Sequence, residues 1–92
     1  MDNTQREDAE QVIRDMAGTV ISYVDARRSH PSFGYTKGMI RTQFSLMEGA
    51  IVLYMNLTKQ ASHAGAPAYL AQFNEERTQH RVDAARDAIN RL

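Results

Sequence analysis

The side chains of this chain that are best suited to binding chemistry are basic and gather in one stretch of the sequence. Residues 26–47 contain no Asp or Glu, although the 92-residue chain balances eleven Lys and Arg against eleven Asp and Glu. Guanidinium and ammonium groups bind phosphates and carboxylates through charge-assisted hydrogen bonds. This stretch is therefore a candidate anion site, with donors from Arg27, Arg28, Lys37, Arg41 and Thr42.

Two aromatic residues lie beside these donors in the sequence. Phe33 and Tyr35 belong to the segment 29–35, which Pro31 and Gly34 mark as a loop. An aromatic ring offers a face on which a base or a guanidinium can stack. The same residues could equally close the end of a helical hairpin, and basic residues near helix ends often only compensate the helix dipole. Ligand binding and a structural role both stay open for this corner.

The sequence has no pattern typical of a catalytic or metal site. It contains no Cys, and its histidines, at positions 30, 63 and 80, fall in three separate segments. No Ser or Thr stands in the context of an activated nucleophile. The glycines are spaced neither as a dinucleotide fingerprint nor as a phosphate-binding loop. We therefore expect a protein that is not an enzyme and that needs no metal or cofactor.

Three predicted helices must position the candidate donors. They cover residues 4–28, 36–60 and 67–92. The apolar residues of the first recur with a period near 3.6, and Thr4 with Glu7 has the spacing of a capping box. Pro67 fits the first turn of the third. These patterns predict an all-α fold in a single domain, in which a helical hairpin is followed by a third, C-terminal helix.

The third predicted helix contains an unbroken polar run. Residues 74–81 are all polar, whereas apolar residues precede and follow them. Such a run is typical of a solvated helix face with i,i+4 pairs such as Glu76 with His80. We therefore expect this helix to dock against the hairpin only near its two ends.

The second predicted helix is apolar around almost its whole circumference between Phe44 and Leu57. A helix of this kind must be covered on all sides, and one helix before it and one after it cannot wrap it completely. A chain of this length also has a thin core when it is alone. We therefore expect copies of the chain to cover the remaining face and to form a compact homo-oligomeric bundle.

Residues 12–57 resemble a family of small phage proteins that sequester nucleotide immune signals, the anti-CBASS and anti-Thoeris sponges. The likeness rests on Val12–Gly18, on Met39–Phe44 and on the apolar helix that follows, and it covers about half of the chain. The resemblance implies a helical homo-oligomer, often a hexamer, that binds cyclic nucleotides between protomers without cleaving them.

The resemblance also implies roles for individual residues. Arg14 is similar to the basic residue that contacts a cyclic dinucleotide in the first helix of that family. Arg41, followed by Thr42, is similar to the arginine that contacts a larger cyclic oligonucleotide. Considered without the resemblance, Arg14 could equally be a solvated partner of a nearby acidic residue.

Two functional hypotheses follow. The first is the binding and sequestration of a phosphate-bearing small molecule, above all a cyclic nucleotide. The alternative is a small helical module that binds a host protein and has no small-molecule ligand, and a purely structural subunit is a third possibility.

The balanced charge argues against general nucleic-acid binding. The polar N-terminus is unlike a signal peptide, and Phe44–Leu57 is too short to span a bilayer, so we expect a cytoplasmic protein without a membrane partner.

Overall fold

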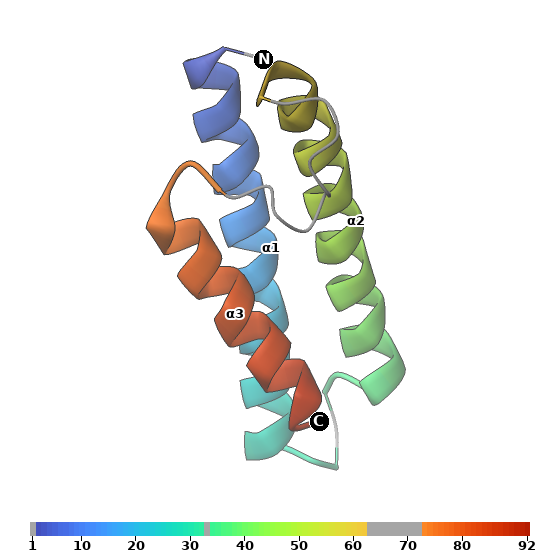
Figure 1. The fold of residues 1–92 in the computed structure, drawn as a ribbon. Coiled ribbons are helices and arrows are strands. Elements are labelled where there is room, and N and C mark those ends of the chain that lie inside the picture. The colour runs from blue at the N-terminus through green and yellow to red at the C-terminus, as the bar shows by residue number, and fades with distance from the viewer. Residues whose placement is uncertain (1, 33, 63–72) are drawn as a thin grey trace.

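The fold consists of a helical hairpin and a third helix that lies against it. The computed structural model describes residues 2–32, 34–62 and 73–92. In these ranges the elements, in chain order, are α1 (Asn3–Ser29), α2 (Lys37–Ser62) and α3 (Glu76–Asn90), with no strand. Figure 1 shows α1 and α2 running antiparallel, with α3 crossing α1. The all-α fold and the three helices are therefore confirmed.

The first helix starts slightly earlier than predicted because a different residue caps it. The Asp2 carboxylate accepts a hydrogen bond from the backbone N–H of Gln5 at 2.8 Å, and the Gln5 side chain accepts one from the Asp2 N–H at 3.0 Å. This reciprocal pair is a capping box that satisfies two free donors at the helix start. The predicted box of Thr4 with Glu7 is wrong, since both residues lie inside the helix.

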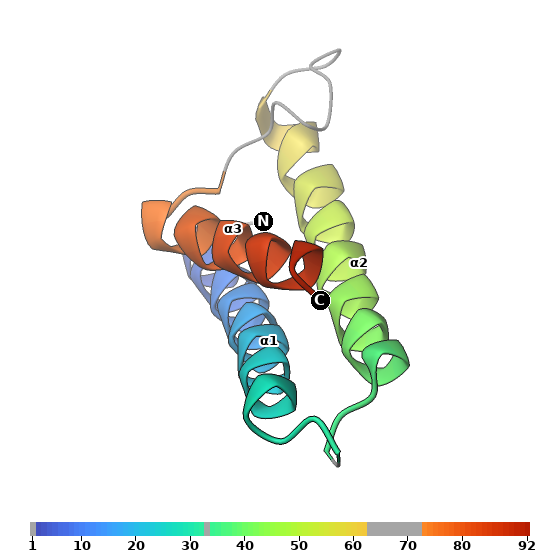
Figure 2. The ribbon, with the colours of Figure 1, turned by 90° about the horizontal axis from the view of Figure 1, so that it is seen from below.

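The core lies where one face of each helix meets the other two. On α1 the buried apolar residues follow a spacing of three and four, which is one stripe of a helix. The buried apolar residues are Ile13, Ala17, Val20 and Val24 of α1, Ile40, Met47, Ile51, Tyr54 and Met55 of α2, and Val82 and Ala85 of α3. In Figure 2 α3 lies in front of α1, and its C-terminal end reaches toward α2.

The third helix differs from its prediction in both its start and its docking. It begins at Glu76 after an extended Glu75, so a helix through residues 73–75 is wrong, and residues 67–72 lie outside the described part of the chain. Its buried residues are Thr78, Val82 and Ala85. They run from the first turn of α3 past its midpoint, and Thr78 belongs to the polar run, so α3 docks along its length and not only at its ends. The expected pair of Glu76 with His80 is present, at 3.6 Å.

The second helix begins at a threonine cap and is tied to α3 by an ion pair. The backbone N–H of Met39 donates to the Thr36 hydroxyl at 3.1 Å, which caps α2. Farther along, the Arg86 guanidinium donates to both carboxylate oxygens of Glu48, at 2.8 and 3.1 Å. This hydrogen bonding raises the pKa of Arg86 above its usual value. None of the helices, over the residues that the structure describes, is long and apolar enough to cross a membrane.

Candidate functional site

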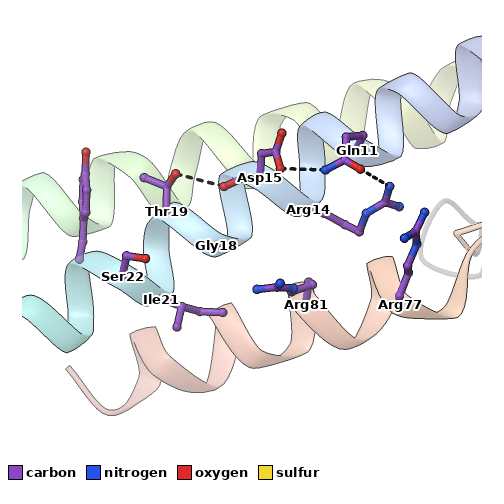
Figure 3. Close-up of a pocket in the computed structure, with 10 residues that line it drawn as sticks. Gln11, Arg14, Asp15, Gly18, Thr19, Ile21, Ser22, Arg77 and Arg81 are labelled. Atoms are coloured by element: carbon purple, nitrogen blue, oxygen red, sulfur yellow. Dashed lines mark hydrogen bonds between the residues drawn. The ribbon is translucent and has the colours of Figure 1, made fainter.

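An open groove runs between α1 and α3 (Figure 3). Its volume is about 750 Å³, which is within the range of small-molecule sites. The residues that line it include three arginines and one aspartate, so the net charge of the lining is positive. The lining residues are Gln11, Arg14, Asp15, Gly18, Thr19, Ile21, Ser22 and Tyr23 from α1, and Arg77 and Arg81 from α3.

Helical spacing explains why these residues share one groove. On α1, positions 11, 15, 18 and 22 are separated by four, three and four residues and so lie along one side of the helix. On α3, Arg77 and Arg81 are one turn apart and therefore neighbours on the same face. A Cβ placed on Gly18 would lie 3.9 Å from Nη1 of Arg81. The end of the Arg81 side chain therefore lies next to Gly18, at a distance where an added methyl group would make an ordinary van der Waals contact.

Arg81 is the groove cation that has no partner among the residues that the structure describes. It is exposed, and neither an ion pair nor a hydrogen bond joins its side chain to another of the described residues. In Figure 3 its guanidinium lies along the groove near Gly18 and Ile21. The neighbouring Arg77 is also exposed and is paired with Glu75. The groove therefore presents two accessible guanidinium groups on successive turns of α3.

Arg14 forms the inner wall of the groove and is held by the protein itself. Its side chain is only 8% exposed. Nη1 donates to Glu75 at 3.1 Å and to the hydroxyl of Thr78 at 2.8 Å, and Nη2 donates to the side-chain oxygen of Gln11 at 2.8 Å. Arg14 is thus inside the candidate site, but its chief contacts join α1 to the first turn of α3. A solvated Arg14 is excluded by this burial.

The start of α3 is fixed by a second buried polar group, Glu10. This carboxylate is fully buried. It accepts hydrogen bonds from the backbone N–H groups of Asn74 at 2.8 Å and Glu75 at 3.1 Å, and from the hydroxyl of Tyr54. Burial and the bond to Glu10 raise the pKa of Tyr54, which keeps its hydroxyl protonated as a donor. Glu10 therefore links all three helices and sets the position of Arg77 and Arg81.

Acid should weaken the contact between α1 and α3 through Glu75. The hydrogen bond from Arg77, with the charges of Arg77 and Arg14, lowers the pKa of Glu75. Because the folded state has the lower pKa, its stabilisation is complete above the usual Glu range and is lost as pH falls through the folded pKa. Denaturant unfolding from about pH 6 to about pH 3 should therefore show the stability difference between the parent and Glu75→Gln shrinking as pH falls. A constant difference across this range would contradict the assignment.

The hairpin end, where the sequence predicts an anion site, is organised mainly by contacts within the protein. Arg27 Nη1 donates to the backbone carbonyl of Tyr35 at 3.2 Å. The ring of Tyr35 stacks on that of Tyr23, with ring centres 3.7 Å apart. Tyr23 also lines the groove, so Tyr35 adjoins the groove through it. Phe33 lies outside the described residues.

The other predicted donors of the hairpin end remain on the surface. Arg28, Lys37 and Arg41 are exposed, and no ion pair or hydrogen bond of their side chains to another described residue is present. The hydroxyl of Thr42 donates to the carbonyl of Gly38 at 2.9 Å. The structure therefore brings Arg27 and Tyr35 into contact but shows no polar contact that unites the whole predicted set.

Arg77 and Arg81 are not among the site residues predicted from the sequence, because they lie in the polar run 74–81, whose pattern is typical of a solvated helix face. Their spacing, one turn apart beside the buried series Thr78, Val82 and Ala85, is the signal that could have placed them at the α1 interface. In the described part of the chain, no group of three or more His, Asp or Glu could hold a metal ion. Comparison with known proteins finds no matching protein-family model, curated protein or solved structure.

Proposed function

We propose that this protein binds a phosphate-bearing small molecule in the groove between α1 and α3 and releases it unchanged. The observation that carries the proposal is Arg81, an exposed guanidinium that lines the groove without a partner among the described residues. A planar guanidinium donates two parallel hydrogen bonds to a phosphate, because its rigid fork of N–H groups matches the spacing of two phosphate oxygens. Arg77, one turn earlier, supplies a second cation.

The rest of the lining supports a nucleotide rather than a simple anion. Thr19 and Ser22 bring hydroxyl groups to the α1 side, and Tyr23 brings an aromatic ring that is already stacked on Tyr35. Hydroxyls suit sugar and phosphate oxygens, and aromatic rings suit bases. A cyclic nucleotide is the ligand that the resemblance to phage sponges implies. Self-association, which the apolar second helix favours, would place more than one such groove on each particle.

The test is a thermal-shift screen and calorimetric titration with cyclic dinucleotides and trinucleotides, with inorganic phosphate as the comparison. A ligand that binds only the folded state raises its melting temperature. Arg81→Ala should weaken binding of the active nucleotide by about 10-fold or more, because one charge-assisted hydrogen bond contributes roughly 1.5–3 kcal/mol. Arg91→Ala, which removes another exposed arginine of the C-terminal region, is the matched control and should leave the Kd unchanged.

Two further results decide between the groove and the hairpin end. If Arg41→Ala abolishes binding and Arg81→Ala does not, the ligand lies at the hairpin end and the groove assignment is wrong. If none of the nucleotides changes the melting temperature, nucleotide capture itself is wrong. Chromatography of the released ligand should return it intact, and an altered nucleotide would contradict a purely sequestering function.

A further inference from the structure

The outward face of α2 carries exposed apolar residues and almost no charge. Its large apolar members are 43–61% exposed, and they are Met39, Leu46, Val52, Leu53 and Leu57. Between Gly38 and Leu57, Arg41 is the one charged residue among the exposed positions of this helix. A surface helix normally places charged residues on its solvent side. This face of α2 therefore has the character of an interface.

We infer that the outward face of α2 binds the same face of a second copy of the chain, with the two helices antiparallel. Large residues recur every seven positions at Met39, Leu46 and Leu53. A seven-residue repeat keeps one side of a helix against a partner helix over several turns. The inference concerns a different surface from the nucleotide groove and does not depend on the proposed function.

The residues between the large ones determine the orientation of the pair. Thr42, Gly49 and Asn56 also recur every seven positions, and all three are exposed and uncharged. An antiparallel pair with its two-fold axis level with residues 47 and 48 places Leu46 opposite the partner's Gly49. It also places Leu53 opposite the partner's Thr42. Each large side chain then meets a smaller one, which is how helix interfaces reach native packing density.

A parallel pair would fit less well. It would place Leu46 opposite Leu46 of the second copy and Gly49 opposite Gly49 of the second copy. Positions with two large side chains would then alternate with positions where a gap remains. A Cβ at Gly49 would have no neighbour within 4 Å in the single chain. The space beside Gly49 is therefore open to a large side chain from another helix.

Charge explains why the partner is a second copy. In a two-fold interface each patch meets itself, so charged groups near the axis would face like charges. A face that is nearly free of charge avoids this repulsion, and a chain with a formal net charge of zero adds no long-range repulsion between copies. A partner selected by electrostatic complementarity would instead need free charges on this face. Between Thr42 and Leu57 the charged residue of α2 is Glu48, which is partly buried and already paired with Arg86 of α3.

The oligomeric state of the full chain tests the inference. Light scattering after size exclusion should give twice the chain mass of 10.4 kDa. Leu53→Asp should halve the measured mass while circular dichroism stays helical, because Leu53 is exposed in the single chain. Val12→Asp is the matched control, since Val12 is an apolar residue of similar exposure but belongs to α1, and it should leave the mass unchanged. A parent of single-chain mass, or a Leu53→Asp variant that keeps the parent mass, would overturn the inference.

Cysteine cross-linking tests the antiparallel register without relying on the Asp variants. The chain contains no Cys, so a single introduced thiol reports only contacts between copies. Gly49→Cys should form a covalent dimer on oxidation, because the two positions are offset by roughly 4.5 Å along the pair. Thr42→Cys should not, because its two positions are offset by roughly 16 Å. Cross-linking of both variants, or of neither, would reject this arrangement.

Discussion

Replacing Glu10 with Ala should lower the free energy of unfolding by about 3–5 kcal/mol. Glu10 is fully buried and accepts from the Tyr54 hydroxyl and from the backbone N–H groups of Asn74 and Glu75. Without the carboxylate, these donors lose their shared acceptor inside the protein, and each unsatisfied buried donor costs about 1–3 kcal/mol. Urea unfolding followed by circular dichroism measures the change.

Two companion variants show how much of this loss comes from one hydrogen bond of Glu10 and how much any carboxylate of α1 would cause. Tyr54→Phe removes one donor and keeps the carboxylate, so it should destabilise by only about 1–2 kcal/mol. Asp8→Ala removes an exposed carboxylate of the same helix and should change stability by less than about 0.5 kcal/mol. If Glu10→Ala were no more harmful than Asp8→Ala, Glu10 would not be the acceptor that holds the start of α3.

Replacing Arg14 with Ala should also destabilise the protein strongly, by about 3 kcal/mol. The Arg14 side chain is buried, and its guanidinium joins Gln11, Glu75 and Thr78. Its loss leaves the buried Thr78 hydroxyl without this donor and removes one of the two cations that pair with Glu75. Arg28→Ala is the matched control, because Arg28 is an exposed arginine of the same helix and its loss should have little effect.

This result bears on the role that the resemblance to phage sponges implies for Arg14. A residue that only contacts a ligand can be removed with little loss of stability in the absence of that ligand. The burial of Arg14 instead predicts a loss of stability even without a nucleotide. An Arg14→Ala variant that unfolds like the parent but binds no nucleotide would contradict the structural role and favour direct contact. Binding assays on this variant therefore need its unfolding curve beside them.

Glu10 and Arg14 connect the stability of the fold to the geometry of the candidate site. Glu10 holds the backbone just before α3, and Arg14 holds its N-cap residue and first turn. Arg77 lies in that first turn and Arg81 in the next. The positions of both groove cations therefore depend on contacts from α1. Substitutions at Glu10 should therefore lower the stability of the fold. They should also lower the affinity for any ligand that binds Arg77 and Arg81.

The periodicity of the sequence was sufficient to predict that the fold is all-helical with three helices, and it marks the buried stripe of α1. On α1, Ile13, Ala17, Val20 and Val24 repeat at helical spacing, and a helix satisfies its own backbone, so this pattern needs no knowledge of the rest of the chain. The same register includes Glu10, three residues before Ile13. Its spacing places it on the buried face of the helix although its side chain is charged, and in the structure it is fully buried.

Tertiary contacts decided the site. Local pattern cannot show that Asn74 and Glu75 come to the carboxylate of Glu10, or that Thr78 comes to Arg14, because these partners are more than sixty residues apart in sequence. Burial of a polar side chain is favourable only when such distant partners satisfy it. The sequence by itself therefore determined that the chain forms three helices and that the second carries a surplus of apolar surface. Only the packing of α3 on α1 decided that the arginines of a polar run would line a groove, because hydrogen-bond partners from separate helices meet there.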